Sequence, residues 1–505
     1  MTMKNSSFRH APPRAGAMIE ALRGLGYSPA TAIADIIDNS ITAGADHVEL
    51  CFDWKAAAST ITVLDNGLGM DDGSLERAMR LGERSPLEER ATHDLGRFGL
   101  GLKTASFSQC RRLTVASRRE GGAVNCLRWD LDLLMNSGDD GWRLFEGPAE
   151  GSEKHLTSLC SRERGTVVVW ESLDRVVTPG FREQDFLDLI DRVEGHLAMV
   201  FHRFLEGSRP RLRISINGND VRPWDPFLTH HAATWSSPVE RIAGDNGMAE
   251  VQCHVLPHHD RLTSHEHSVA AGPDGWTAQQ GFYVYRNERL LVSGSWLGLG
   301  RGRSWTKEEA HRLARIRLDF ANAEDSDWKI DIRKSSARPP FAIREQLTRL
   351  AEDTRDRARR VFAHRGQMVK RTSGPPVAQA WRVEHFAGGL RYRIDRDHPA
   401  VRAVLDDLSD GGTQIKAMLR ILEETIPVQR IWLDTTESKE APRTGFGGES
   451  AEAVQSVLIV LYRNLVLRRG MTPQEARDQL AHTEPFNSHA ELVAALPDEP
   501  LAERS

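Results

Sequence analysis

Three short polar and glycine-rich segments near the start of the chain constrain its fold more than any other feature. They are DIIDN at residues 35–39, DNGLGM at residues 65–70 and GRFGLGLKTAS at residues 96–106. Each segment alone has an ordinary structural explanation. Their order and spacing carry more information than any one of them.

The first segment is predicted to lie on a helix that begins after Ser28 and ends near Gly44. Ser28 and Pro29 suit the N-cap and first-turn positions of a helix. Helical spacing predicts two faces: Ile33, Ile36, Ile37 and Ile41 on one, and Asp35, Asp38, Asn39 and Thr42 on the other. The simplest interpretation is an amphipathic helix with a solvated acidic face. However, Asp35 and Asn39 are four residues apart, and a carboxylate beside an amide oxygen suits a general base next to a Mg²⁺ ligand.

The second segment follows a predicted strand, residues 60–64, and places Asp65 where the strand ends. Gly67 and Gly69 give the following turn its backbone freedom. Asp65 can accept a hydrogen bond from an exocyclic amine, and the glycines let a flat ring approach the backbone. The alternative is an ordinary DNG turn, in which the side chains bond only to their own backbone.

The third segment places Gly96, Gly99 and Gly101 before a predicted helix that begins near Leu100. Backbone N–H groups at the start of such a helix bind phosphate, and Lys103 adds a positive charge. A glycine-rich loop without a ligand is the alternative. Two common nucleotide motifs are excluded, because the sequence has no GxxxxGK[ST] and no predicted strand directly before Gly96.

In their order and spacing, the three segments resemble the motifs of the GHKL superfamily, which includes DNA gyrase, a heat-shock chaperone, histidine kinases and MutL. The nearest resemblance is to prokaryotic MORC-like, MutL-like and chaperone-like ATP-binding proteins. It implies an α+β protein that begins with a Bergerat-fold ATPase domain, an α/β sandwich. It also implies ATP and Mg²⁺ as the ligands.

The resemblance assigns a role to each matching residue. It implies that Asp35 is the catalytic base and that Asn39 holds Mg²⁺. It implies that Asp65 reads adenine, with Thr166 of RGTVVVW (residues 164–170) beside it through water. Residues 82–98 would form a lid over the nucleotide. The remaining residues implied to bind the nucleotide are Gly67, Gly69, Met70, Gly96, Phe98, Gly99, Leu100, Gly101, Lys103 and Thr104.

One departure from the family pattern affects the chemistry. The first segment usually begins with Glu in the hydrolysing branches, whereas here it begins with Asp35, which is one methylene shorter. A misplacement of about 1 Å in a catalytic group can cost about 100-fold in rate. The departure therefore predicts slow hydrolysis, or hydrolysis that needs a partner.

Downstream segments resemble the second domain of MutL and MORC ATPases. GFYVYRNERLL at residues 281–291 predicts a strand, a polar turn and a second strand. WKIDIRKSSARPP at residues 328–340 predicts a strand and a basic loop, followed by a helix from Phe341. The family sends a lysine from such a loop to the γ-phosphate, which implies Lys334, with Lys329 as second choice. The alternative is that both are surface lysines.

A chain of 505 residues is long enough for about three domains, and shifts in composition predict where they divide. We expect an ATP-binding domain at 1–205, an S5-like transducer domain at 206–370 and a mainly helical C-terminal module at 371–505. In the last, helices are predicted at 451–469 and 473–482, and we interpret the module as a packing or partner-docking unit.

Charge and cysteine usage restrict the environment. A net charge of −5 gives no overall basic signal for nucleic acid, so any DNA contact must be a local patch. Five cysteines without a CxxC pair predict reduced thiols in a cytoplasmic protein. The longest apolar stretch, residues 457–461, is too short to cross a bilayer, and we expect no membrane association.

Two further clusters have open interpretations. Histidines gather at positions 230, 231, 254, 258, 259, 265 and 267, and we favour solvated loop residues over a metal site because their spacing matches no standard ligand pattern. A basic run suits either a DNA backbone contact or a solvated helix face. It consists of Arg355, Arg357, Arg359, Arg360, Arg365, Lys370 and Arg371.

The resemblance implies an ATPase that closes as a homodimeric clamp, with ATP hydrolysis driving the cycle. The clamp would act on double-stranded DNA in a restriction, defence or remodelling role, with a separate nuclease or helicase as partner. Two alternatives stay open. One is a chaperone-like clamp on proteins, and the other is a nucleotide sensor with little turnover.

Overall fold

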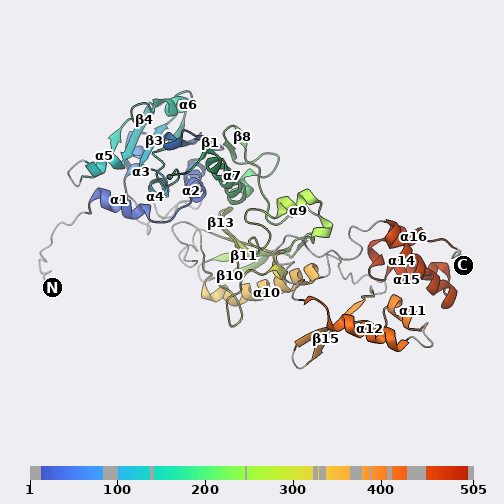
Figure 1. The fold of residues 1–505 in the computed structure, drawn as a ribbon. Coiled ribbons are helices and arrows are strands. Elements are labelled where there is room, and N and C mark those ends of the chain that lie inside the picture. The colour runs from blue at the N-terminus through green and yellow to red at the C-terminus, as the bar shows by residue number, and fades with distance from the viewer. Residues whose placement is uncertain are drawn as a thin grey trace, which may run out of the picture. The chain divides into compact units, whose positions relative to one another are not determined.

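The structure is a computed structural model of the 505-residue chain. The described residues are 13–83, 101–136, 141–244, 247–321, 328, 337–363, 378–386, 389–406, 412–428, 431 and 451–498. The chain divides into two compact units, Met1–Gln367 and Met368–Ser505, which are described separately (Figure 1).

The first unit begins with an eight-stranded sheet in the order β5-β4-β3-β6-β2-β1-β7-β8. Neighbouring strands are antiparallel, except that β1 and β7 are parallel. The inner strand β6 is buried on both faces: Val168 and Trp170 contact the large core, and Val167 and Val169 contact a smaller cluster. The strands are β1 (His47–Asp53), β2 (Thr60–Asp65), β3 (Arg112–Arg118), β4 (Val124–Asp130), β5 (Phe145–Glu146), β6 (Gly165–Glu171), β7 (Arg213–Ile216) and β8 (Asn219–Asp220).

Helices pack against the large core of this sheet, and α2 lies against both α4 and α7 (Figure 1). The predicted helix after Ser28 is confirmed, because the Ser28 hydroxyl caps Thr31 and Pro29 is the first helical residue. Gly44 follows its end with φ +73°. The helices are α1 (Ala15–Arg23), α2 (Pro29–Thr42), α3 (Asp72–Met79), α4 (Gly101–Phe107), α5 (Leu131–Asn136), α6 (Thr157–Cys160), α7 (Glu183–Val200) and α8 (His202–Leu205).

A second sheet follows in the same unit, in the order β10-β11-β14-β12-β13, with β9 paired to β11. Strands β12 and β14 are parallel. Helix α10 packs along this sheet against β10, β11 and β14 (Figure 1). The elements are β9 (Trp235–Ser236), β10 (Glu240–Ala243), β11 (Met248–Val255), α9 (Ser264–Ala270), β12 (Gly281–Arg286), β13 (Arg289–Ser295), β14 (Ala314–Phe320) and α10 (Phe341–Ala363).

The predicted hairpin at residues 281–291 is confirmed as β12 and β13. Arg286 pairs with Arg289, so the loop between them is two residues long. Asn287 and Glu288 have φ of 47° and 67°, the positive values that two-residue hairpin turns require. The turn thereby fixes where β13 starts and places Arg289 at its first position.

Polar contacts join the second sheet to the helices of the first. Arg203 of α8 forms an ion pair with Asp319 of β14, and its guanidinium lies 3.5 Å from the ring centroid of Tyr285. His202 shares a hydrogen bond of 2.7 Å with the Tyr285 hydroxyl. Helix α7 also contacts β13 directly. The two sheets of the first unit therefore meet at a packed interface.

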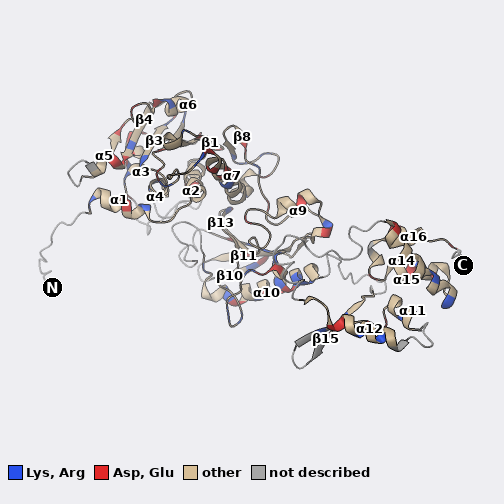
Figure 2. Cartoon of the chain, viewed as in Figure 1, with Lys and Arg blue, Asp and Glu red and all other residues tan. Residues whose placement is uncertain are grey.

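Helix α10 confirms the predicted helix from Phe341, and it carries both charge signs along its length (Figure 2). Arg355 is 8% exposed and lies over the rings of Trp296 and Trp305, at 4.7 Å and 4.8 Å. Arg355 is thus neither a free DNA contact nor part of a solvated face. The predicted basic residues Arg365, Lys370 and Arg371 lie outside the described residues.

The second unit contains a β15–β16 hairpin and a group of helices. The predicted helices are confirmed, because α14 continues through a π-helical turn at Asn464–Arg468, and Thr472 caps α15. Leu458, Leu465 and Leu480 belong to its core. Its elements are β15 (Trp381–Phe386), β16 (Gly389–Ile394), α11 (Pro399–Asp406), α12 (Gly412–Glu424), α14 (Ala451–Arg463), α15 (Pro473–Ala481) and α16 (Ala490–Ala494).

The predicted α+β class is confirmed, and the described part of the C-terminal module is mainly helical. The domain boundary predicted between residues 205 and 206 stays a prediction. Strands β7 and β8 lie after this boundary in the chain, but they complete the first sheet. The other predicted boundaries also stay predictions. All five cysteines are unpaired. Within the described ranges, no helix has both the length and the apolar character needed to cross a membrane.

Candidate active site

Asp65 lies at the end of β2, where it is 7% exposed and pairs in register with Thr166 of β6. Its Oδ2 accepts a hydrogen bond from the Ser40 hydroxyl at 2.8 Å. Its Oδ1 accepts bonds from the backbone N–H groups of Gly67, at 2.9 Å, and Thr166, at 3.2 Å. Burial raises the pKa of Asp65, and these bonds oppose the shift. The carboxylate is therefore a buried, fixed acceptor.

A pair of hydroxyl groups continues this network on the adjacent strands. The hydroxyls of Ser117 and Thr166 lie 2.8 Å apart, and the Ser117 oxygen accepts a hydrogen bond from the Met70 N–H at 2.8 Å. Met70 and Thr166, both predicted to bind the nucleotide, are thus connected through Ser117, and the Thr166 N–H bonds in turn to Asp65.

Gly67 and Gly69 form the turn after β2, as predicted. Gly69 has φ +66°, and a Cβ there would lie 1.8 Å from the carbonyl oxygen of Arg118. A Cβ at Gly67 would lie 3.0 Å from the Cβ of Ala43. The protein's own backbone therefore requires glycine at position 69, and packing leaves little room for a side chain at position 67. The predicted approach of a ring to this turn stays a prediction.

The prediction that the acidic face of α2 is exposed to solvent is wrong for the carboxylates of Asp35 and Asp38. Asp35 is 5% exposed and Asp38 is 1% exposed, whereas Asn39 one turn after Asp35 is exposed. The Tyr27 hydroxyl donates a hydrogen bond of 2.9 Å to Oδ2 of Asp35. The face is buried because α2 is packed against α4 and α7 together.

Arg289 brings a buried positive charge from β13 to these carboxylates. Its Nε donates to Oδ1 of Asp38 at 3.1 Å, and its Nη2 lies 3.8 Å from Oδ1 of Asp35. Arg289 itself is 4% exposed. On α7, burial and the nearby Arg289 charge lower the pKa of His196 to about 4, so this imidazole is neutral at neutral pH.

The three sequence segments meet at α2. Ser40, the residue after Asn39, bonds directly to Asp65 of the second segment. Gly101 of the third segment begins α4, and a Cβ there would lie 3.7 Å from Oδ2 of Asp35. The fold therefore brings Asp65 and Gly101 against α2, the helix that carries Asp35. The roles that the resemblance implies for them stay predictions.

Lys103 and Thr104 lie on α4 and are 3% and 0% exposed. The Lys103 ammonium donates to the carbonyl oxygen of Ala78, at the end of α3, at 2.8 Å. Burial lowers the pKa of Lys103 to about 8. The roles predicted for both residues at the phosphates stay predictions.

Two groups of predicted site residues fall in parts of the chain that are not described. Residues 84–98 of the predicted lid lie outside the described residues, as do Gly96, Phe98, Gly99 and Leu100. The same holds for Lys334 and Lys329 and for most of the predicted strand at 328–340. Their predicted roles are unchanged.

Four residues of the site were missed by sequence reasoning: Tyr27, Ser40, Ser117 and Arg289. Ser40 sits beside Asn39, and a polar residue directly after the predicted metal ligand is a signal that could have been used. Ser117 is a small polar residue that is buried near the end of β3, but a serine in a strand gives only a weak signal. Tyr27 and Arg289 give no local signal, because their partners come from the tertiary fold.

The histidine prediction is partly wrong. His254 is 1% exposed and bonds to the Ser236 hydroxyl at 2.8 Å, and burial, with Arg317, lowers its pKa to about 4. His258 is also buried. His258, His259 and Asp260 place one ligand atom each within 4.8 Å of one another.

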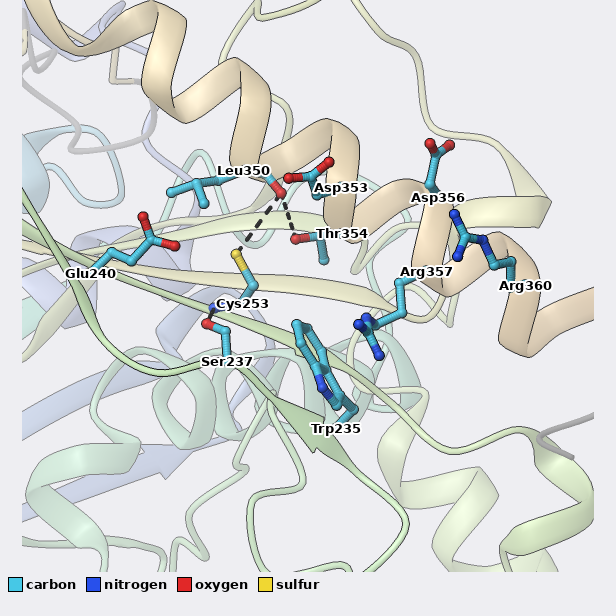
Figure 3. Close-up of a pocket in the computed structure, with 10 residues that line it drawn as sticks. All are labelled: Trp235, Ser237, Glu240, Cys253, Leu350, Asp353, Thr354, Asp356, Arg357 and Arg360. Carbon is cyan, nitrogen blue, oxygen red and sulfur yellow. Dashed lines mark hydrogen bonds between the residues drawn. The ribbon is translucent and has the colours of Figure 1, made fainter. Parts of the chain in front are cut away.

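A cavity of about 330 Å³ lies between α10 and the strands β9 to β11 (Figure 3). Arg357 lies 3.9 Å from the ring centroid of Trp235 in this cavity, and Glu240 and Asp353 add negative charge. Among the described residues, none that is predicted to bind the nucleotide lines this cavity. We place the candidate active site at α2 instead, because the hydrogen bonds of Asp65 and Asp35 converge there.

The comparisons with known proteins agree with this placement. Residues 27–166 match the family of histidine kinase-, DNA gyrase B- and HSP90-like ATPases. The match begins at Tyr27 and ends at Thr166, so it spans α2, Asp65 and α4. Residues 27–166 therefore match the ATPase domain of the GHKL superfamily.

Within that superfamily the chain is similar to DNA mismatch repair protein MutL. MutL of Shewanella piezotolerans is 27% identical over 270 residues, which cover 52% of this chain and 39% of that protein. MutL of Rhodospirillum rubrum is 25% identical over 256 residues, or 48% and 37%. MutL of Rhizobium leguminosarum is 36% identical over 96 residues, or 19% and 16%. The chain spans less than two fifths of the length of the first two relatives.

Replacing Ser40 tests the link between the first two segments. In Ser40→Ala, Asp65 loses a buried donor, and we expect a loss of about 1–3 kcal/mol in the free energy of unfolding near pH 7. The loss should be smaller near pH 4, because the raised pKa of Asp65 then leaves much of the carboxyl protonated in the folded protein. Urea unfolding at both pH values measures the difference.

Ser59→Ala is the matched control. Ser59 is 1% exposed, and its hydroxyl donates to the carbonyl oxygen of Ala56, a neutral acceptor. Its cost should be the same at both pH values. An equal cost for Ser40→Ala at both pH values would contradict a hydrogen bond to an ionised Asp65.

Proposed function

We propose that this chain is a Mg²⁺-dependent ATPase in which nucleotide binding and hydrolysis drive dimerisation and clamp closure, on double-stranded DNA. The proposal rests on the contacts at α2, the helix of Asp35. There Ser40 bonds to Asp65, and Gly101 lies next to Asp35. The family match of residues 27–166 supports ATP as the ligand. The MutL relatives, which are DNA mismatch repair proteins, support a role on DNA.

The polar groups of the site suit the binding of adenine, phosphate and a metal ion. Asp65 is a fixed acceptor for an exocyclic amine, and the Ser117–Thr166 hydroxyl pair beside it can order a water molecule. Asn39 exposes an amide oxygen beside the buried Asp35, a combination that suits a hard cation. Mg²⁺ would be held by Asn39 and the phosphates, and it would offset phosphate charge.

Asp35 is the proposed base. Tyr27 holds one of its oxygens, and the carboxylate would accept a proton from the water that attacks the γ-phosphate. Lys334 is the proposed lysine of the transducer domain that reaches this phosphate, and residues 82–98 are the proposed lid. The shorter Asp side chain makes slow turnover the expected behaviour, since general-base catalysis depends on distance.

The dimer and the partners are the further parts of this proposal. Two N-terminal domains dock when ATP closes the lid, and the resulting clamp encloses DNA in a restriction, defence or remodelling role. A separate nuclease or helicase would act beside it. Two alternatives stay open. A chaperone-like clamp would bind protein clients without binding DNA, and a nucleotide sensor would bind ATP with little turnover.

Steady-state ATP hydrolysis tests the assignment of the base and the metal ligand. Asp35→Asn should lower kcat by at least about 100-fold while ATP still binds, because only the base is lost. Asn39→Ala should abolish the Mg²⁺-dependent part of ATP binding. Asp188→Asn, an exposed carboxylate on α7, serves as control and should match the wild type.

The same assay with double-stranded DNA tests the clamp. We expect DNA to raise wild-type turnover and a non-hydrolysable ATP analogue to convert monomers to dimers. Tight ATP binding without turnover, with or without DNA, would favour the sensor. A monomer in saturating analogue would contradict the clamp.

The buried Lys103 leads to a prediction about the pH dependence of ATP binding. Its pKa is about 8 in the free protein because it is buried, and a phosphate beside it would raise that pKa. ATP binding should therefore take up a proton where Lys103 is neutral beforehand, and the affinity should fall as the pH rises above about 8. Calorimetry near pH 8.5 in two buffers of different ionisation enthalpy measures the uptake.

Lys103→Met should remove this proton uptake, and Lys55→Met, at an exposed lysine, should leave it unchanged. Wild-type binding without proton uptake would contradict contact between Lys103 and the nucleotide.

A further inference from the structure

Arg289 is the residue through which the second sheet reaches the proposed base. It is 4% exposed, and the two-residue turn after β12 fixes its position at the start of β13. Its guanidinium lies between two carboxylates of α2: Nε bonds to Asp38 at 3.1 Å, and Nη2 faces Asp35 at 3.8 Å. Its Nη1 donates to the carbonyl oxygen of Leu290 at 2.8 Å.

This arrangement restrains Asp35 from two sides. Tyr27 donates to its Oδ2, and Arg289 lies beside its Oδ1, so each oxygen has a neighbour from a different element. The buried carboxylates of Asp35 and Asp38 lie less than one turn apart and repel each other, and a cation between them offsets this repulsion. The planar guanidinium has donors in several directions at once, which an ammonium group does not have.

We propose that Arg289 is a positioning residue that orients Asp35 for catalysis, so that turnover depends on the seating of the β12–β13 hairpin against α2. The inference rests on the proposed function, in which Asp35 is the base. Movement of the second sheet relative to α2 changes the distance between Arg289 and Asp35. The hairpin thereby couples the position of the second sheet to hydrolysis.

Arg289→Lys tests this role because lysine keeps the charge beside Asp38 but has no planar fork for Asp35 as well. We expect kcat for ATP to fall by about 10- to 100-fold with the KM unchanged, since a misplaced catalytic group affects the chemical step. Thermal melting should stay close to that of the wild type.

Arg393→Lys is the matched control. Arg393 is 7% exposed, and its guanidinium also pairs with two carboxylates of one helix, Glu423 and Glu424 of α12, in the second unit. Its kcat should equal that of the wild type. An equal loss in both variants would assign the effect to the loss of any buried arginine fork and would overturn the inference.

A double variant separates positioning from stability. Arg289→Met alone removes the cation that pairs with the buried Asp38 carboxylate, and it is expected to melt earlier. Asp38→Asn combined with Arg289→Met removes both charges, and we expect the melting temperature to recover while kcat stays low, because Asp35 still lacks Arg289. Recovery of kcat together with the melting temperature would overturn the inference.

The wild type separates failure of this inference from failure of the proposed function. If the wild type turns over and Arg289→Lys matches it, the inference alone is wrong. If the wild type shows no turnover in any condition, the proposed hydrolysis is wrong, and the inference is wrong with it.

Discussion

The hydrogen bond from Ser40 to Asp65 is the contact on which the geometry of the site depends. It joins α2, which carries Asp35 and Asn39, to the end of β2, which carries the acceptor proposed to read adenine. Because both groups are buried, the bond also offsets part of the cost of burying the Asp65 carboxylate. The distance between the proposed adenine end and the proposed phosphate end of the site is therefore set by the position of α2.

Burial of charge around α2 has a consequence for the second sheet. Asp35 and Asp38 are both buried, and the cation beside them comes from β13, far along the chain. Breaking a buried ion pair by removing one partner is strongly unfavourable. The second sheet thus takes part in the electrostatics of α2, and the contacts of Arg203 and His202 hold the same interface.

Local sequence patterns were enough to predict the helix after Ser28, the strand before Asp65, the β12–β13 hairpin and the helices of the second unit. Each depends on caps, turns or periodicity within a short stretch. The burial of Asp35 and Asp38 was not predictable in this way, because periodicity assumes one buried helix face and α2 is packed on more than one. The contacts of Ser40, Ser117 and Arg289 join residues 25, 49 and 251 positions apart, so only the fold reveals them.

Binding of a non-hydrolysable ATP analogue with Mg²⁺ tests the central claim most directly. Calorimetry with the wild type should give one nucleotide per chain, and Asp65→Ala should abolish binding, whereas Asp46→Ala at an exposed carboxylate should not. A weaker response to the corresponding GTP analogue would agree with Asp65 as the acceptor for the adenine amine. A wild type that binds no nucleotide, or binding that persists in Asp65→Ala, would contradict the claim that the three segments form one ATP site.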